Sequence, residues 1–104
     1  MQYTTTESYA GTNKKNIGEL VEALKKINHP GIKYSVYIME DGKTFMHLDH
    51  FAGEAEHEFL QQLPEFKKFA AELWDSRMEV KPKLDLLSVV GSTVEFPGWV
   101  MANP

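Results

Sequence analysis

His47 and Asp49 are the two residues of this chain whose types and spacing are best suited to acid–base chemistry. They stand two positions apart in a stretch with the composition of a β-strand, so we expect their side chains to share one face of a sheet. An imidazole held beside a carboxylate can act as a general base on a phenolic or enolic substrate, and the resulting carbanion can react directly with dioxygen. The alternative is a structural role, in which these side chains and a neighbouring tyrosine satisfy one another's hydrogen bonds.

The tyrosine is Tyr34, which a predicted hairpin places opposite Asp49. Residues 32–39 and 44–51 are rich in β-branched and aromatic side chains, and Asp41-Gly42 between them is a strong hairpin signal. Counting outward from a tight turn predicts these cross-strand pairs: Tyr34 with Asp49, Ser35 with Leu48, Val36 with His47, Tyr37 with Met46, and Ile38 with Phe45.

Three more side chains are candidates for the wall of a ligand pocket: Tyr37, His57 and Trp74. His57 follows the acidic start of a predicted helix and could approach the mouth of a pocket, but a solvated helix histidine has the same sequence pattern. Trp74 lies at the edge of a helical apolar stripe, and its indole N–H needs a polar partner, so it could line a pocket or an interface.

Several other chemistries have no support in the sequence. The chain has no cysteine, which excludes disulfides, thiolate metal sites and cysteine nucleophiles. His50 would point to the opposite face from His47, so one regular strand cannot bring both to a metal. There is no glycine-rich phosphate loop followed by a helix, and no Gly-x-Ser-x-Gly motif. We therefore expect neither a metal nor a cofactor.

Hydrophobic periodicity predicts the elements that position these side chains. Residues 2–10 favour a first strand, and a capping box formed by Asn16 and Glu19 favours a helix from there to Ile27. The cluster Asn28-His29-Pro30-Gly31 ends that helix.

The hairpin is followed by a second helical region and a last strand. The helical region begins after Gly53, breaks at Leu63-Pro64 and continues to about Arg77, while residues 84–92 favour the last strand. The order βαββαβ is that of an α+β, ferredoxin-like fold, with four antiparallel strands and both helical regions on one face.

Composition bounds the remaining possibilities. A chain of 104 residues with 42% hydrophobic and 25% charged residues is expected to form one globular domain, residues 1–104. The net charge of −4 and the lack of a large basic cluster argue against nucleic acid as a partner. No apolar run approaches the length of a membrane span, and the polar first residues do not resemble a signal peptide, so we expect a cytoplasmic protein without a membrane partner.

Both faces of the predicted sheet carry apolar residues, whereas one layer of helices can cover only one face. A second copy of the sheet is the simplest cover for the other face, so the sequence predicts a homodimer. The tail, residues 93–104, is rich in large apolar side chains such as Trp99, and we expect it to dock on the dimer, with the partner protomer preferred.

Four segments resemble small bacterial dimeric α+β-barrel proteins related to the antibiotic-biosynthesis-monooxygenase group: residues 31–37, 40–48, 63–69 and 89–92. The resemblance implies two protomers with their sheets face to face and a ligand cavity in each protomer. Members of that group include cofactor-independent monooxygenases, haem-degrading enzymes and lyases. Leu60 and Glu65 stand where the monooxygenases often carry histidines.

Two functions are therefore expected from the sequence. The first is a small-molecule-binding homodimer with cofactor-independent monooxygenase-like activity on a small aromatic or polyketide-like compound. In that case His47 is the base, Asp49 orients it, and Tyr34, Tyr37 and Trp74 shape the pocket. The second is a non-catalytic ligand-binding or accessory dimer. The environment of His47 discriminates between them, because an imidazole open to a cavity favours chemistry and a fully hydrogen-bonded, buried one favours structure.

Overall fold

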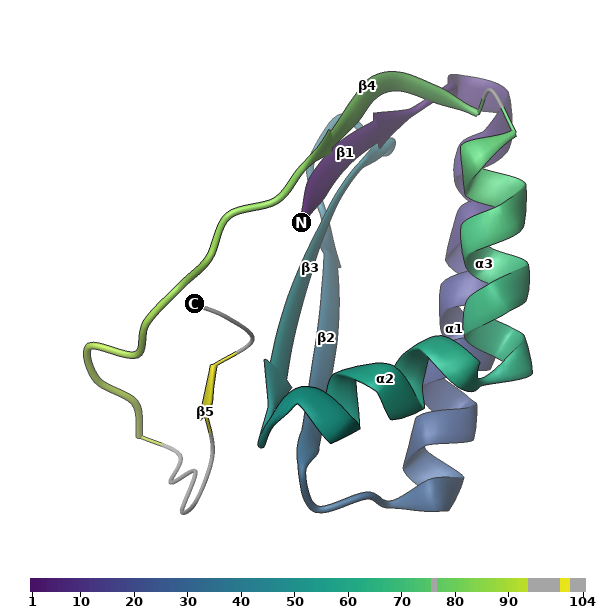
Figure 1. Ribbon diagram of the computed structural model, residues 1–104. Coiled ribbons are helices and arrows are strands. Elements are labelled where there is room, and N and C mark those ends of the chain that lie inside the picture. Colours follow the sequence, from purple (N-terminus) through teal and green to yellow (C-terminus); the bar gives the residue numbers. More distant parts are fainter. Residues whose placement is uncertain (76, 94–99, 102–104) are drawn as a thin grey trace.

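The chain forms an antiparallel sheet with its helices gathered on one face (Figure 1). The computed structural model describes residues 1–75, 77–93 and 100–101. Its strands are β1 (Gln2–Thr5), β2 (Ile32–Ile38), β3 (Thr44–Phe51), β4 (Met78–Lys83) and the two-residue β5 (Val100–Met101). Its α-helices are α1 (Ala10–Ile27), α2 (Glu54–Gln62) and α3 (Pro64–Trp74). The main strands lie in the order β2-β3-β1-β4, and β5 pairs with the end of β3.

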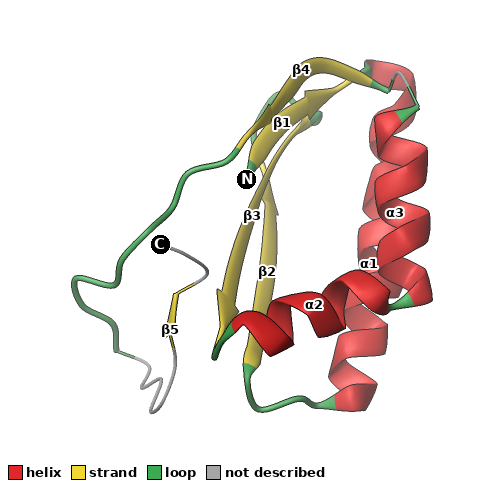
Figure 2. Cartoon of the chain, viewed as in Figure 1, coloured by secondary structure: helices red, strands yellow, loops and turns green. Residues whose placement is uncertain are grey.

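This arrangement confirms the expected α+β class and is compatible with a ferredoxin-like fold (Figure 2). The predicted barrel of two such sheets involves a second chain and stays a prediction. None of the helices described is long and apolar enough to cross a membrane.

The β2–β3 hairpin has the predicted register, with Tyr34 opposite Asp49 and Val36 opposite His47. Asp41 holds the turn, because its Oδ1 accepts hydrogen bonds from the backbone N–H groups of Lys43 at 2.9 Å and Thr44 at 2.8 Å. Gly42 has a φ of 74°, a left-handed conformation that favours glycine. The turn chemistry therefore fixes which side chains of β3 face the helices.

The helix-covered face of the sheet forms the core. Tyr3 of β1 and Phe45 of β3 lie opposite each other and stack, with ring centroids 5.7 Å apart, beneath Phe69 and Leu73 of α3. His47 lies on this same face and is only 2% exposed. The opposite face is more open, since Tyr37 of β2 is 58% exposed.

The first strand is shorter and the first helix longer than the sequence predicted. β1 ends at Thr5, and a 3₁₀ turn at Glu7–Tyr9 leads into α1 at Ala10. Asn16 is not an N-cap; it is a buried residue of the helix interior whose Nδ2 donates to Glu72 Oε1 of α3 at 3.0 Å. The capping-box pattern therefore predicted the wrong helix start, because Asn16 makes a contact between α1 and α3 and does not cap α1.

The C-terminal half contains one confirmed prediction and one wrong one. The break at Leu63-Pro64 is confirmed, since Leu63 is extended and Pro64 opens α3. The last strand is Met78–Lys83 and not residues 84–92, which have no regular secondary structure. Pro82 is tolerated within β4 because β4 is an edge strand, where a proline's missing N–H costs no ladder hydrogen bond. α3 also ends at Trp74, before Arg77.

The tail lies for the most part outside the described residues. Of residues 94–104, the structure describes only Val100–Met101, which pairs with His50 and Phe51 at the end of β3 in the same chain. Docking of the tail on a partner protomer, including the role of Trp99, stays a prediction.

Candidate functional site

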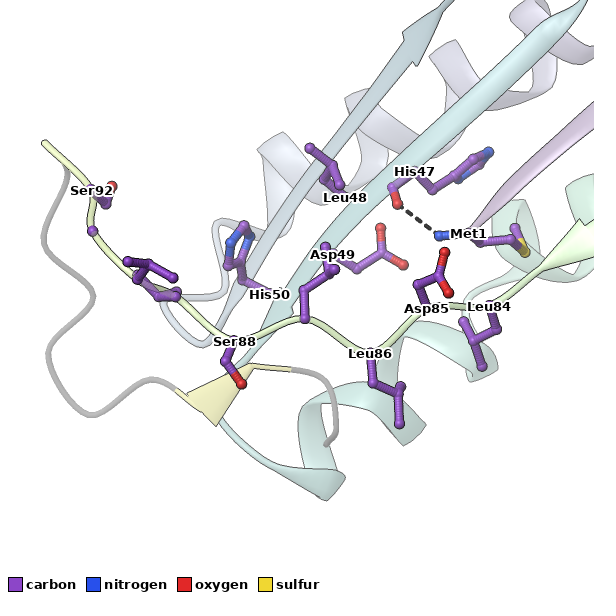
Figure 3. Close-up of a pocket in the computed structure, with 14 residues that line it drawn as sticks. Met1, His47, Leu48, Asp49, His50, Leu84, Asp85, Leu86, Ser88 and Ser92 are labelled. Carbon is purple, nitrogen blue, oxygen red and sulfur yellow. Dashed lines mark hydrogen bonds between the residues drawn. The ribbon is translucent and has the colours of Figure 1, made fainter.

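A pocket of about 360 Å³ lies between β3 and the segment that follows β4 (Figure 3). This is within the usual size range of small-molecule sites. The described residues that line it are Met1, His47, Leu48, Asp49, His50, and residues 84–92.

The fold leaves this space beside the second half of β3. β1 pairs with the first half of β3, with Gln2 opposite Met46, while β5 pairs only with His50 and Phe51. After Lys83 the chain leaves the sheet, and residues 84–92 run along the open side of the pocket (Figure 3). The apolar side chains of this segment are well exposed and give the pocket an apolar wall: Leu84, Leu86, Leu87, Val89 and Val90.

Asp49 is the principal polar group at the inner wall. Its Oδ1 is buried and has no hydrogen-bond partner within the described part of the chain. Burial raises the pKa of Asp49 to about 6, because desolvation disfavours the charged carboxylate. The side chain therefore changes protonation close to neutral pH, beside an apolar cavity.

His47 belongs to a buried hydrogen-bond chain and not to the open part of the pocket. Its Nε2 lies 2.8 Å from the Tyr3 hydroxyl, and its Nδ1 lies 2.8 Å from the Tyr34 hydroxyl. Asn13 Nδ2 in turn donates to the Tyr3 hydroxyl at 2.9 Å. The ring also packs against Phe69, with centroids 5.4 Å apart. Both ring nitrogens are thus engaged inside the core.

Burial lowers the pKa of His47 to about 3, so the imidazole is neutral near pH 7. Because Asn13 donates to Tyr3, the Tyr3 hydroxyl hydrogen is free to point at Nε2. A neutral ring that accepts at Nε2 carries its hydrogen on Nδ1 and donates to the Tyr34 oxygen. In this arrangement His47 is the Nδ1–H tautomer and both ring nitrogens are hydrogen-bonded.

The surroundings of His47 match the structural alternative that the sequence left open. A general base must reach the proton that it removes, and this imidazole is sealed by two tyrosines and a phenylalanine. The ring is turned away from the pocket, and His47 borders it through its backbone (Figure 3). There the Met1 amino group donates to the His47 carbonyl at 3.1 Å. A catalytic role for His47 stays a prediction.

The structure brings together three of the six candidate residues. Tyr34, His47 and Asp49 lie on one face of the β2–β3 hairpin, as expected. Tyr37 lies on the opposite face, and Trp74, at the end of α3, is 58% exposed. His57 of α2 packs edge-on against Phe51, with centroids 5.1 Å apart. Tyr37, His57 and Trp74 are not among the described residues that line the pocket.

Sequence reasoning missed Tyr3, Asn13 and the wall of residues 84–92. Asn13 had a usable signal, because it lies four residues before Ile17 and seven before Leu20, on the buried stripe of α1. Tyr3 could be placed only once β1 was known to pair with β3 opposite Phe45. Residues 84–92 had been assigned to a strand, so their role as a pocket wall was hidden.

Comparisons of the chain with protein-family models, with curated proteins and with solved structures found no match. The resemblance to the antibiotic-biosynthesis-monooxygenase group thus stays an expectation from sequence, and the function is argued from the site alone.

Proposed function

We propose that the protein binds a small, largely apolar molecule in the pocket between β3 and residues 84–92. The observation that carries the proposal is the Asp49 carboxyl group, whose buried Oδ1 has no partner in the described structure and which borders an apolar cavity of about 360 Å³. Buried polar atoms are nearly always hydrogen-bonded, so an unpaired acceptor on a side chain that lines a cavity supports an external partner. An apolar pocket with few polar groups is the common form of a ligand site.

Non-catalytic binding is the alternative that the geometry favours. The residue expected to act as base, His47, is neutral, buried and hydrogen-bonded at both ring nitrogens. These features support a role in holding β2 and β3 in position around Asp49.

One observation favours a catalytic function as a second candidate. A carboxylate with a pKa near 6 beside a cavity has the properties of a general base at neutral pH. In a cofactor-independent monooxygenase-like reaction, Asp49 would then remove the proton of a phenolic or enolic substrate, in place of His47. Oxygen uptake by the protein with phenolic compounds, absent in Asp49→Asn, tests this candidate.

The homodimer remains part of the proposal. On the sheet face away from the helices, Tyr37 and Val80 are each 58% exposed, and Met46 and Leu48 are partly buried. Apolar side chains gathered on one face commonly mark an interaction surface. These residues support a second copy as the cover of that face.

Native mass spectrometry of gently purified protein tests ligand binding. We expect a small-molecule mass increment that survives dialysis and is lost on denaturation. Ser88→Trp, which places a large ring in the pocket wall, should abolish the increment, whereas Ser8→Trp, on the distant 3₁₀ turn, should retain it. An identical increment in both variants, or none in the wild type at any stage, would count against the pocket.

A further inference from the structure

The unpaired oxygen of Asp49 restricts the class of ligand that the pocket can accept. A carboxylate oxygen only accepts hydrogen bonds, and leaving a buried acceptor without a donor is unfavourable. Oδ1 of Asp49 is buried and has no donor within the described residues. A hydroxyl or ammonium group of a ligand in the pocket would supply a donor to this carboxyl group, whereas an ether or a hydrocarbon would not.

The charges of the pocket disfavour an anion. Its described lining contains two carboxyl groups, Asp49 and Asp85, against one cation, the Met1 ammonium group, and neither lysine nor arginine. Figure 3 shows both carboxyl groups directed toward the part of the pocket where the Met1 amino group lies. Lys83 lies nearby, but its Nζ is 4.0 Å from Asp85 and both side chains are well exposed. A carboxylate ligand would be desolvated next to Asp49 and would compete with Asp49 and Asp85 for the single ammonium group of Met1.

The remainder of the lining selects for an apolar body. Leu48 and the leucines and valines of residues 84–90 form the main apolar part of the wall. Burial of the ligand's hydrocarbon against them provides affinity, and the Asp49 hydrogen bond orients the polar end.

We infer that the ligand of this pocket is an apolar compound that donates a hydrogen bond to Asp49 and carries no negative charge. This inference rests on the proposed function and names the chemistry of its ligand.

Binding of such a donor depends on pH in a defined direction. A donor interacts more strongly with the ionised carboxylate, so affinity should fall as Asp49 becomes protonated below a pKa of about 6. The groups that face Asp49 are the Tyr34 phenol of β2, the Met1 amino group and Asp85. Tyr34 has a pKa raised well above its usual range by burial, so it does not titrate in this window.

Four matched probes test the inference by calorimetry or ligand-observed NMR: 2-phenylethanol, 2-phenylethylamine, 2-phenylethyl methyl ether and phenylacetate. We expect the alcohol or the amine to bind about tenfold more tightly than the ether, and phenylacetate to bind most weakly. If the alcohol binds more tightly than the amine, the natural ligand is neutral; if the amine binds more tightly, the natural ligand is cationic. The preference for a donor over the ether should shrink by about tenfold between about pH 7.5 and about pH 5.

Asp49→Leu and Asp85→Leu are matched variants, since each removes one carboxylate from the pocket and leaves no acceptor on that side chain. Asp49→Leu should remove most of the preference for a donor, and Asp85→Leu should retain it. Ether and alcohol of equal affinity in the wild type, or phenylacetate that binds as well as the alcohol, would overturn the inference and leave the binding function standing. Failure of all four probes to bind would overturn both the inference about the ligand and the proposed binding function.

Discussion

At the scale of single residues, the chain separates two polar groups that the sequence had treated as one. His47 is sealed in the core between Tyr3 and Tyr34, and Asp49, two residues later on the same strand, borders the pocket. A shared face therefore did not mean a shared function. The hydrogen-bond chain from Asn13 to Tyr34 links α1 to the sheet, whereas Asp49 Oδ1 has no partner within the described residues.

Removal of the His47 side chain should destabilise the fold. We expect His47→Ala to lower the free energy of unfolding by about 1–3 kcal/mol, because it leaves the Tyr3 hydroxyl without its acceptor inside the core. Urea denaturation measures the loss. Lys14→Ala, on the exposed side of α1, is the control and should change stability far less. A His47→Ala variant as stable as the wild type would contradict the structural role.

His47 and Asp49 have opposite effects on the pH dependence of stability. Between pH values of about 3 and 6.5, the His47 ring binds a proton in the unfolded chain but not in the folded one, so stability falls as the pH is lowered. Asp49 binds a proton in the folded chain but not in the unfolded one between about 3.8 and 6, so its contribution rises as the pH is lowered. The two contributions oppose each other between about pH 4 and pH 6.

Asp49→Asn should therefore steepen acid destabilisation. Each group contributes at most about 1.4 kcal/mol per pH unit, so removing the Asp49 contribution should make the variant lose about 2–3 kcal/mol more than the wild type from about pH 6 to about pH 4. Urea denaturation at several pH values measures this difference. Parallel stability curves for the two proteins would show that Asp49 has no raised pKa in the folded state.

At the scale of elements, the glycine turn and the proline break were the reliable guides. Asp41-Gly42 predicted the register of the β2–β3 hairpin, and Leu63-Pro64 predicted the break between α2 and α3. Both signals act through the backbone of the residues themselves. The sequence could therefore predict the pairing of Tyr34 with Asp49.

Predictions that depended on distant partners were the ones that failed. Asn16 matched an N-cap, but its amide contacts Glu72, a residue of another helix. The apolar residues 84–90 matched a strand better than the more polar β4, but β4 is the segment that pairs with β1. Local composition does not determine which segment pairs with the free edge of β1. The role of residues 84–92 as the wall of the pocket therefore could not be predicted.

Two glycines offer a direct test of the backbone argument. Gly42→Ala should destabilise the protein by about 1 kcal/mol, because φ of 74° is unfavourable for alanine even though a Cβ would meet nothing within 4 Å. Gly18→Ala, in the interior of α1 and equally free of close contacts, should stabilise it by about 0.5–1 kcal/mol. Thermal denaturation of both variants checks the signs. If both substitutions destabilised the protein, side-chain packing and not backbone conformation would determine their effects.

At the scale of the whole molecule, the two faces of the sheet differ in what covers them. The helices cover the face of Tyr3, Phe45 and Val36, while Tyr37 and Val80 lie exposed on the other. Leu48 of β3 belongs both to the pocket lining and to this second face. Dimer formation and ligand binding would therefore involve neighbouring surfaces.

The proposed dimer should have a mass of twice 11.9 kDa in light scattering. Tyr37→Asp should give a folded monomer, because a carboxylate placed in an apolar interface disfavours association more than folding. Val36→Asp, one residue earlier on β2 but packed toward the core, should instead unfold the chain. A wild-type protein that is monomeric at micromolar concentration would contradict the dimer.

The titration of Asp49 in the presence of a donor ligand tests the central claim, that this carboxyl group is the polar anchor of a ligand pocket. Carboxyl ¹³C NMR follows Asp49 directly, with Asp49→Asn to assign the signal. We expect a pKa of about 6 in the free protein, and a clear decrease when the pocket is saturated with whichever of 2-phenylethanol or 2-phenylethylamine binds more tightly. A pKa near the ordinary value of 3.8 in the free protein, or one that the bound probe leaves unchanged, would contradict it.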